Sequence, residues 1–343
     1  MRAIRWIVVA AVMAFTCGAA ADERPTAEDL LAAFEKSVEN LARVKIEWSQ
    51  KGDKGADYDQ EMTVFRDGPR WKAERLVIQK AGKRSGETTR QQTLVGDEIL
   101  TLSLTNRPQD DKPRLRRLIM AARERIEIRT WTSGRLGCHV LFGRMAGDLG
   151  QPLWTVMRES GSVELLPETE VIDGIETYVL KSRGKYGEHK VWLDPAHGGL
   201  PRRIEIHKLP GNFLDDEQLG TPPALRPGRT QNENWTLIDK IQIEKQKDVF
   251  VITGYESAVS LAFADVKNPR EKTTRRPTGP MTELRFRVEV DPREFPADAF
   301  RFAVEIPNGT PVLVEDNLPL RYQGPDKSEH EWFDGKIRER VAK

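Results

Sequence analysis

Apolar and polar residues alternate with a period of two in many short segments of this chain. In LRFRVEV (284–290), Leu284, Phe286 and Val288 fall on one side of an extended backbone, and arginines and a glutamate fall on the other. Successive side chains of a strand point to opposite faces, so the pattern predicts strands with one buried face. A sheet made of such strands needs a second layer over its apolar face.

Short connections rich in Gly, Pro, Asp and Asn separate many of these segments, as in Asp67-Gly68-Pro69. Connections of this kind join antiparallel neighbours. The sequence therefore predicts one large antiparallel sheet. Its predicted strands are 44–51, two strands within 61–78, and 98–104, 177–182, 188–194, 201–207, 240–245, 249–255, 283–290 and 300–306.

A helix is predicted just before the first strand. Thr26 is placed to cap it, and Asp29 follows three residues later as the reciprocal partner of a capping box. Apolar residues then recur at helical spacing, which predicts a helix with one buried stripe. The stripe consists of Leu30, Leu31, Phe34, Val38 and Leu41.

The segment HKVWLDPAHGGLPRRIEIHK (189–208) gathers three histidines and an aspartate around a Pro-Gly-Gly turn. Two interpretations compete, a metal or catalytic site and a plain hairpin. His189, His197 and His207 match no metal-ligand spacing, whereas the flanks alternate as two strands should. The pattern therefore favours a solvent-facing hairpin.

One section, about 113–161, breaks the strand pattern. LRRLIMAARERIE, LGCHVLFGRM and PLWTVMRE each carry apolar residues at helical spacing, which predicts a helical insertion. Arginines on the other side of the first of these helices suggest a solvated face. Two further segments, 211–234 and 267–280, are predicted loops, the second Pro-rich and basic. The arginines are Arg114, Arg116, Arg117, Arg123 and Arg125.

The first 21 residues have the layout of a secretory signal peptide, with Arg2 and Arg5, an apolar run and a small-residue triplet ending at Ala21. The sequence around Cys17 is a poor lipoprotein signal, so lipid anchoring there is not expected. Cleavage leaves 52 basic and 53 acidic residues and no further long apolar stretch. We therefore expect an exported, periplasmic or secreted chain with no transmembrane segment and no field that recruits nucleic acid.

Motifs of catalysis and metal binding are absent from the sequence. It has no G-x-S-x-G elbow and no Gly-rich phosphate loop before a helix. Cys138 and His139 are adjacent in the chain, and Cys138 is predicted to be a small buried residue. The acidic run 215–217 lacks the alternation of a calcium loop. The sequence thus predicts a non-catalytic protein without metal or cofactor.

Several motifs follow one another in a recognisable order. After the capped helix come a strand ending in Trp48-Ser49-Gln50, then Gly68-Pro69-Arg70-Trp71, then IDGIETYVLKS (172–182) and the hairpin VWLDPAHGGLPRRIEI. Phe300, Phe302, Pro307 and Gly309 complete a closing Phe-x-Phe…Pro-x-Gly pattern. This order resembles the outer-membrane lipoprotein carrier (LolA-like) family and its exported bacterial relatives.

The resemblance implies a curved, incompletely closed antiparallel half-barrel covered by helices, spanning 22–316, with 317–343 as an extension. It also implies a non-catalytic carrier that binds lipid acyl chains or lipoproteins. The residues expected to line its apolar cavity are Val44, Ile46, Trp48, Met62, Val64, Leu100, Leu102, Leu104, Val191, Leu193, Ile204, Ile206, Leu284, Phe286, Val288, Phe302 and Val304.

Two questions stay open at this level. The same apolar face can be a filled core or an open cavity. The long arginine-bearing section and the basic loop also suit an alternative role, an envelope sensor or module that docks a protein partner. At the C-terminus, Trp332-Phe333 and Lys336-Ile337 flank Asp334-Gly335, which predicts a terminal hairpin that docks on the sheet edge.

Overall fold

The structure is a computed structural model. It describes residues 24–50, 58–82, 85–95, 99–108, 114–121, 138–145, 148, 151–214, 217–220, 229–265, 274–277, 282–302, 304–315, 330–333 and 336–339. The expected signal peptide with Cys17, the acidic pair 215–216 and the side chain of Cys138 lie outside the described residues.

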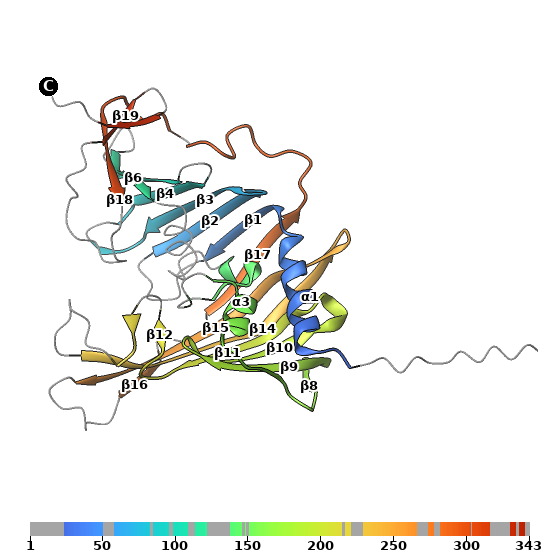
Figure 1. Ribbon diagram of the computed structural model, residues 1–343. Helices are drawn as coiled ribbons and strands as arrows, with labels where there is room; N and C mark the ends of the chain where they lie inside the picture. The colour runs from blue at the N-terminus through green and yellow to red at the C-terminus, as the bar shows by residue number, and fades with distance from the viewer. Residues whose placement is uncertain are drawn as a thin grey trace, which may run out of the picture.

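Most of the chain forms one open, curved and mainly antiparallel sheet (Figure 1). From one edge, its strands follow the order β7 and β8, β9, β10, β11, β14, β15, β17 and β1. The bounds are β7 Val163–Leu165, β8 Glu170–Ile172, β9 Ile175–Gly184, β10 Gly187–Asp194, β11 Leu200–Lys208, β14 Arg229–Gln246, β15 Val249–Asp265, β17 Thr282–Val290 and β1 Arg43–Gln50.

The sheet continues from β1 through β2, β3, β4, β5, β6, β18, β19 and β20. Each of these pairs is antiparallel except β6 with β18, which is parallel. The bounds are β2 Tyr58–Asp67, β3 Arg70–Gln79, β4 Thr88–Val95, β5 Ile99–Asn106, β6 Arg114–Ala121, β18 Thr310–Glu315, β19 His330–Phe333 and β20 Lys336–Glu339.

The two halves of the sheet meet at β17. The first part of β17 pairs with β15, with Leu284 opposite Tyr255, and its second part pairs with β1, with Phe286 opposite Trp48. The strand thus leaves one neighbour for the other along its length. Figure 1 shows the sheet bending there, with α1 and α3 on the concave side between the halves.

Two helices and a 3-10 turn cover the concave face: α1 (Ala27–Glu39), α3 (Leu153–Glu159) and η2 (Cys138–Phe142). Their apolar side chains join those of both sheet halves in one buried cluster, which is the main core. The predicted capping box of α1 is confirmed, since Asp29 N donates to Thr26 Oγ1 at 3.1 Å and Thr26 N donates to Asp29 Oδ2 at 2.9 Å. None of the described helices is long and apolar enough to cross a membrane.

The predicted hairpin at 189–208 is confirmed as β10, a short 3-10 turn (η3, Pro195–His197) and β11. Its turn faces solvent at Pro195 and Ala196, whereas Gly199 at its end is buried. The turn packs beneath α1, where Ser37 Oγ donates to the carbonyl of Gly198 at 2.6 Å. Gly199 has φ +71°, and a Cβ there would lie 2.9 Å from the Ala33 Cβ and 3.0 Å from the Phe34 nitrogen. The Gly-Gly pair therefore lets the helix and the turn approach closely.

The predicted helical insertion at 113–161 is wrong in its first part. Residues Arg114–Ala121 form strand β6, which pairs with β5 on one side and β18 on the other. Apolar residues at Leu115, Leu118 and Ile119 fit a helix locally, but the two neighbouring strands supply hydrogen bonds on both sides. Only Cys138–Phe142 and Leu153–Glu159 are helical among the described residues of this section.

Other boundaries also differ from those predicted. The predicted loop 211–234 holds a small pair of strands, β12 (Phe213–Leu214) and β13 (Glu217–Gln218), and β14 already begins at Arg229. The predicted loop 267–280 contains β16 (Thr274–Pro277), which pairs with β15. The described residues of the predicted strand 300–306, which are 300–302 and 304–306, are turn or irregular backbone, and the strand nearby is β18. The predicted terminal hairpin is confirmed as β19 and β20, and β19 pairs with β18.

Replacing Gly199 with Ala tests the close packing of α1 on the β10–β11 turn. The Cβ adds left-handed backbone strain of about 1–2 kcal/mol and a steric overlap with α1 of about 1–3 kcal/mol. Gly174→Ala is the matched control, because Gly174 has φ +82° and nothing within 4 Å of its added Cβ. In urea unfolding, Gly199→Ala should lose clearly more stability than Gly174→Ala. Equal losses of stability in the two variants would show that an added Cβ at position 199 causes no steric destabilisation against α1.

Truncation after Gln323 tests the terminal hairpin. Removing β19 and β20 leaves one side of β18 without its partner, and an unpaired edge strand invites pairing with another molecule. The truncated chain should melt at a lower temperature and self-associate in light scattering after size-exclusion chromatography. A monomer with an unchanged melting curve contradicts the docking role.

Candidate functional site

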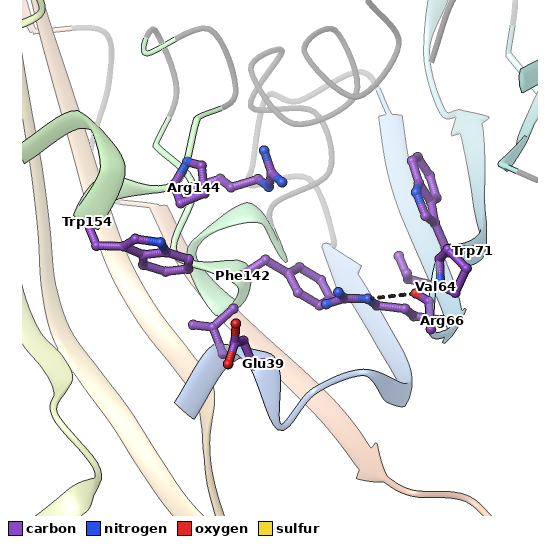
Figure 2. Close-up of a pocket in the computed structure, with 11 residues that line it drawn as sticks. Glu39, Val64, Arg66, Trp71, Phe142, Arg144 and Trp154 are labelled. Carbon is purple, nitrogen blue, oxygen red and sulfur yellow. Dashed lines mark hydrogen bonds between the residues drawn. The ribbon is translucent and has the colours of Figure 1, made fainter. Parts of the chain in front are cut away.

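A pocket of about 180 Å³ lies on the concave side of the sheet (Figure 2). Three parts of the chain enclose it: the C-terminal end of α1, the β2–β3 hairpin, and the covering segment, by which we mean the described residues between Cys138 and Glu159. The lining residues are Val38, Glu39, Val64, Arg66, Gly68, Pro69, Trp71, Phe142, Arg144, Pro152 and Trp154.

Strand register places one wall of the pocket. Val64 and Arg66 are two residues apart on β2 and so share a face, and Trp71 of β3 lies directly opposite Arg66. The Arg66 guanidinium lies 5.4 Å from the centre of the Phe142 ring, and its Nε donates to the Gly68 carbonyl at 3.5 Å. Figure 2 shows the Arg66 side chain extending from the β2–β3 hairpin toward Phe142 of the covering segment.

The opposite wall belongs to the covering segment. Phe142 and Trp154 are buried, and Trp154 packs edge-on against Phe34 of α1 with ring centres 5.2 Å apart. Gly143 has φ +62°, and a Cβ at this position would overlap the Trp154 ring. This wall therefore depends on close packing between η2, α3 and α1.

The pocket combines apolar walls with few charges. Arg66, Arg144 and Glu39 are its charged residues, and aromatic or aliphatic side chains make most of the rest. Its volume is below the ~300 Å³ typical of sites for drug-sized ligands. Such a pocket can accept a short apolar group beside a polar or charged one.

Most of the predicted lining residues are buried together in the main core, and of these only Val64 is among the residues that line the pocket. Strand register and packing bring them to one face, although they lie on strands from both halves of the sheet. The residues in this cluster are Val44, Ile46, Trp48, Met62, Val64, Val191, Leu193, Ile204, Ile206, Leu284, Phe286 and Val288.

Four of the remaining predicted lining residues pack in a second cluster. Leu102 pairs with Gln92, which pairs with Glu74, and Glu74 pairs with Thr63, so Leu102 lies on the face opposite Val64. Leu102 and Leu104 form a separate buried cluster with Leu118, Ile306 and Val312, and Phe302 and Val304 pack against it. These four residues are thus packed in a cluster separate from that of Val64. The side chain of Leu100 lies outside the described residues.

Sequence reasoning missed most of the residues that line the pocket. Arg66 continues the alternation of Met62 and Val64, so its face could have been predicted from β2 alone. Phe142 and Trp154 lie in short apolar runs that are typical of any buried turn or helix. Nothing local in the sequence indicates that these runs meet the β2–β3 hairpin.

A second group of polar side chains is buried on the concave side. Asp148 of the covering segment lies 3.1 Å from Nε2 of His189 on β10 and 2.5 Å from Nζ of Lys208 on β11. Their side chains are at most 2% exposed. Burial by itself raises the pKa of Asp148, but the charges and hydrogen bonds of His189 and Lys208 outweigh it and leave that pKa below its usual value.

The surroundings of His189 contain residue types found in nucleophilic catalysis. Ser182 lies opposite His189 in the sheet register, and no hydrogen-bond partner of its Oγ is found among the described residues. The pocket beside His189 and Ser160 measures only about 10 Å³, however, which is room for about one water. Among the described residues, the space beside this group is therefore too small for a substrate in this conformation.

The three histidines of 189–208 have separate carboxylate partners. His189 contacts Asp148, His197 lies 2.7 Å from Asp194, and His207 lies 2.8 Å from Glu233. Asp194 Oδ2 also lies 2.8 Å from both Nε and Nη2 of Arg202, so the carboxylate at the end of β10 is joined to β11 across the turn. Among the described residues, no three His, Cys, Asp or Glu side chains are placed to hold a metal ion.

His139 gives the covering segment a pH dependence. It is buried in η2, and burial lowers its pKa from 6.5 to about 4. Between these values the unfolded chain binds a proton that the folded chain does not, so stability falls as pH drops from 6.5 to 4. The loss contributed by this residue reaches about 3 kcal/mol.

Urea unfolding at pH 7.5, 5.5 and 4.5 measures this effect. His139→Gln should flatten the decline with falling pH, whereas the control His207→Gln, whose ring is partly exposed, should retain it. Identical pH profiles for the parent chain and His139→Gln would contradict the assignment.

Comparison with known proteins adds no family assignment. Neither a scan against protein-family models nor a search of curated proteins produced a match to this chain. The LolA-like resemblance therefore stays a prediction that rests on the order of the motifs. What the structure adds is an open curved sheet with a covered concave face and a small mixed pocket on that face.

Proposed function

We propose that this chain is an exported, non-catalytic lipid-binding carrier with a LolA-like half-barrel. One observation carries the proposal: a pocket with aromatic and aliphatic walls lies between the concave face of a curved sheet and the helices that cover it. Apolar surface at such a place attracts an acyl chain, since each methylene that leaves water contributes ~0.8 kcal/mol.

The size of the pocket limits how a ligand would bind. At about 180 Å³ it accommodates part of an acyl chain, and a longer chain requires that the covering segment move away from the sheet. The aromatic residues Trp71, Phe142 and Trp154 supply broad apolar contact area. Arg66 and Arg144 place positive charge beside this surface, next to Glu39.

The alternative role as an envelope sensor loses part of its motivation. It rested on an arginine-bearing helix, and the first stretch of that section is strand β6, which is paired on both sides with β5 and β18. The basic loop 267–280, in which β16 pairs with β15, still suits a docking role. The carrier proposal accounts for the pocket, and the sensor proposal does not.

A pair of variants on one strand tests the carrier proposal. Val64 lines the pocket, and its neighbour Thr63 is half-buried and points to the other face of β2. Val64→Phe fills the pocket and should weaken binding of a fluorescent fatty acid at least tenfold. Thr63→Phe adds at least as much volume on the other face and should leave affinity unchanged.

Native mass spectrometry of the purified protein gives an independent readout. Bound lipid should be found on the parent chain and on Thr63→Phe, and less on Val64→Phe. A parent chain that carries no lipid and binds no fluorescent fatty acid refutes the carrier proposal.

A further inference from the structure

The contacts of Asp148 join the covering segment to the sheet. The carboxylate belongs to the covering segment, whereas Lys208 and His189 lie on two neighbouring strands, β11 and β10. Pocket residues flank Asp148 along the chain, with Phe142 and Arg144 before it and Pro152 and Trp154 after it. A displacement of Asp148 therefore moves the chain on both sides of it, and with it one wall of the pocket.

Burial makes these contacts sensitive to the loss of either charge. Lys208 and Asp148 are fully buried, so each depends on the other to balance its charge. Lys208 also donates to the carbonyl of Phe213 at 3.1 Å and lies 5.5 Å from the Tyr186 ring, which fixes the ammonium group in place. A single buried charge without its partner is strongly unfavourable, whereas removal of both charges is tolerated better.

We propose that Asp148 is the positioning residue of the pocket, and that its ion pair with Lys208 and its contact with His189 hold the covering segment on the sheet. Loss of these contacts releases the wall formed by Phe142 and Trp154. The consequence for ligand release rests on the proposed carrier function. The attachment of the covering segment does not.

Hydrogen–deuterium exchange of the full chain tests the attachment without any ligand. In Asp148→Asn, exchange in peptides that cover 138–159 should rise at least tenfold, and exchange in β1–β3 should stay within twofold of the parent. Lys208→Met should act in the same direction. The double variant should raise exchange by less than the product of the two single effects, because it leaves no unbalanced charge.

Asp194→Asn is the matched control. Asp194 is equally buried and also contacts a histidine and a basic side chain, but its partners His197 and Arg202 belong to its own hairpin. This variant should raise exchange around the hairpin turn rather than selectively in 138–159. If Asp148→Asn does not fold, His189→Gln replaces it, with an expected two- to fivefold rise in the same peptides.

Unchanged exchange in 138–159, or a uniform rise that Asp194→Asn reproduces, overturns the proposal. A fluorescent fatty acid then measures the consequence for the pocket, and its dissociation from Asp148→Asn should be at least fivefold faster. Where exchange rises locally but the parent chain binds no fatty acid, the carrier function fails and the positioning role of Asp148 stands.

Discussion

Three parts of the chain meet at the side chain and backbone of Phe34: α1, the covering segment and the β10–β11 turn. Its ring is fully buried and packs edge-on against Trp154 of α3. A Cβ on Gly143 would lie 3.1 Å from the tip of the Phe34 ring, and a Cβ on Gly199 would lie 3.0 Å from the Phe34 nitrogen. The helix, the covering segment and the β10–β11 turn can therefore share one core only because two of these positions are glycine.

This junction explains why the concave face is covered where it is. A curved sheet with one apolar face needs a second layer, and α1 alone is too short to cover both halves. The covering segment supplies the rest, and its position depends on α1 through Phe34 and on the sheet through Asp148. The pocket lies where the β2–β3 hairpin, α1 and this segment come together without filling the space between them.

Periodicity in the sequence predicted the strands with one buried face, such as β17, and the helix α1 with its cap. It failed at β6, because Leu115, Leu118 and Ile119 match helical spacing and not a period of two. A register shift between β5 and β6 brings Leu115 and Leu118 to one cluster, and β6 pairs with the distant β18. Register across four strands decides that Leu102 and Val64 lie on opposite faces. Alternation within each strand does not reveal the order of the strands.

Alternation within strands also made part of the buried cluster around Asp148 predictable. His189 shares the alternation of Val191 and Leu193, and Lys208 shares that of Ile204 and Ile206, so both fall on the apolar face. A histidine and a lysine on such a face need a buried partner. Nothing in the sequence around Asp148 identifies it as that partner, because the contact spans two segments that meet only in the folded chain.

Asp148 and Asp194 make the same kind of buried contacts but stabilise different parts of the structure. Both carboxylates are fully buried, and each contacts one histidine and one basic side chain, which is Lys208 for Asp148 and Arg202 for Asp194. The partners of Asp194 lie within its own hairpin, so its contacts shape a local turn. The partners of Asp148 lie on two strands of the sheet, so its contacts decide where a separate segment sits. Buried ion pairs contribute little net stability compared with apolar packing, but they strongly disfavour arrangements that separate them. The long-range pair therefore acts mainly on the position of the pocket wall rather than on the stability of the fold.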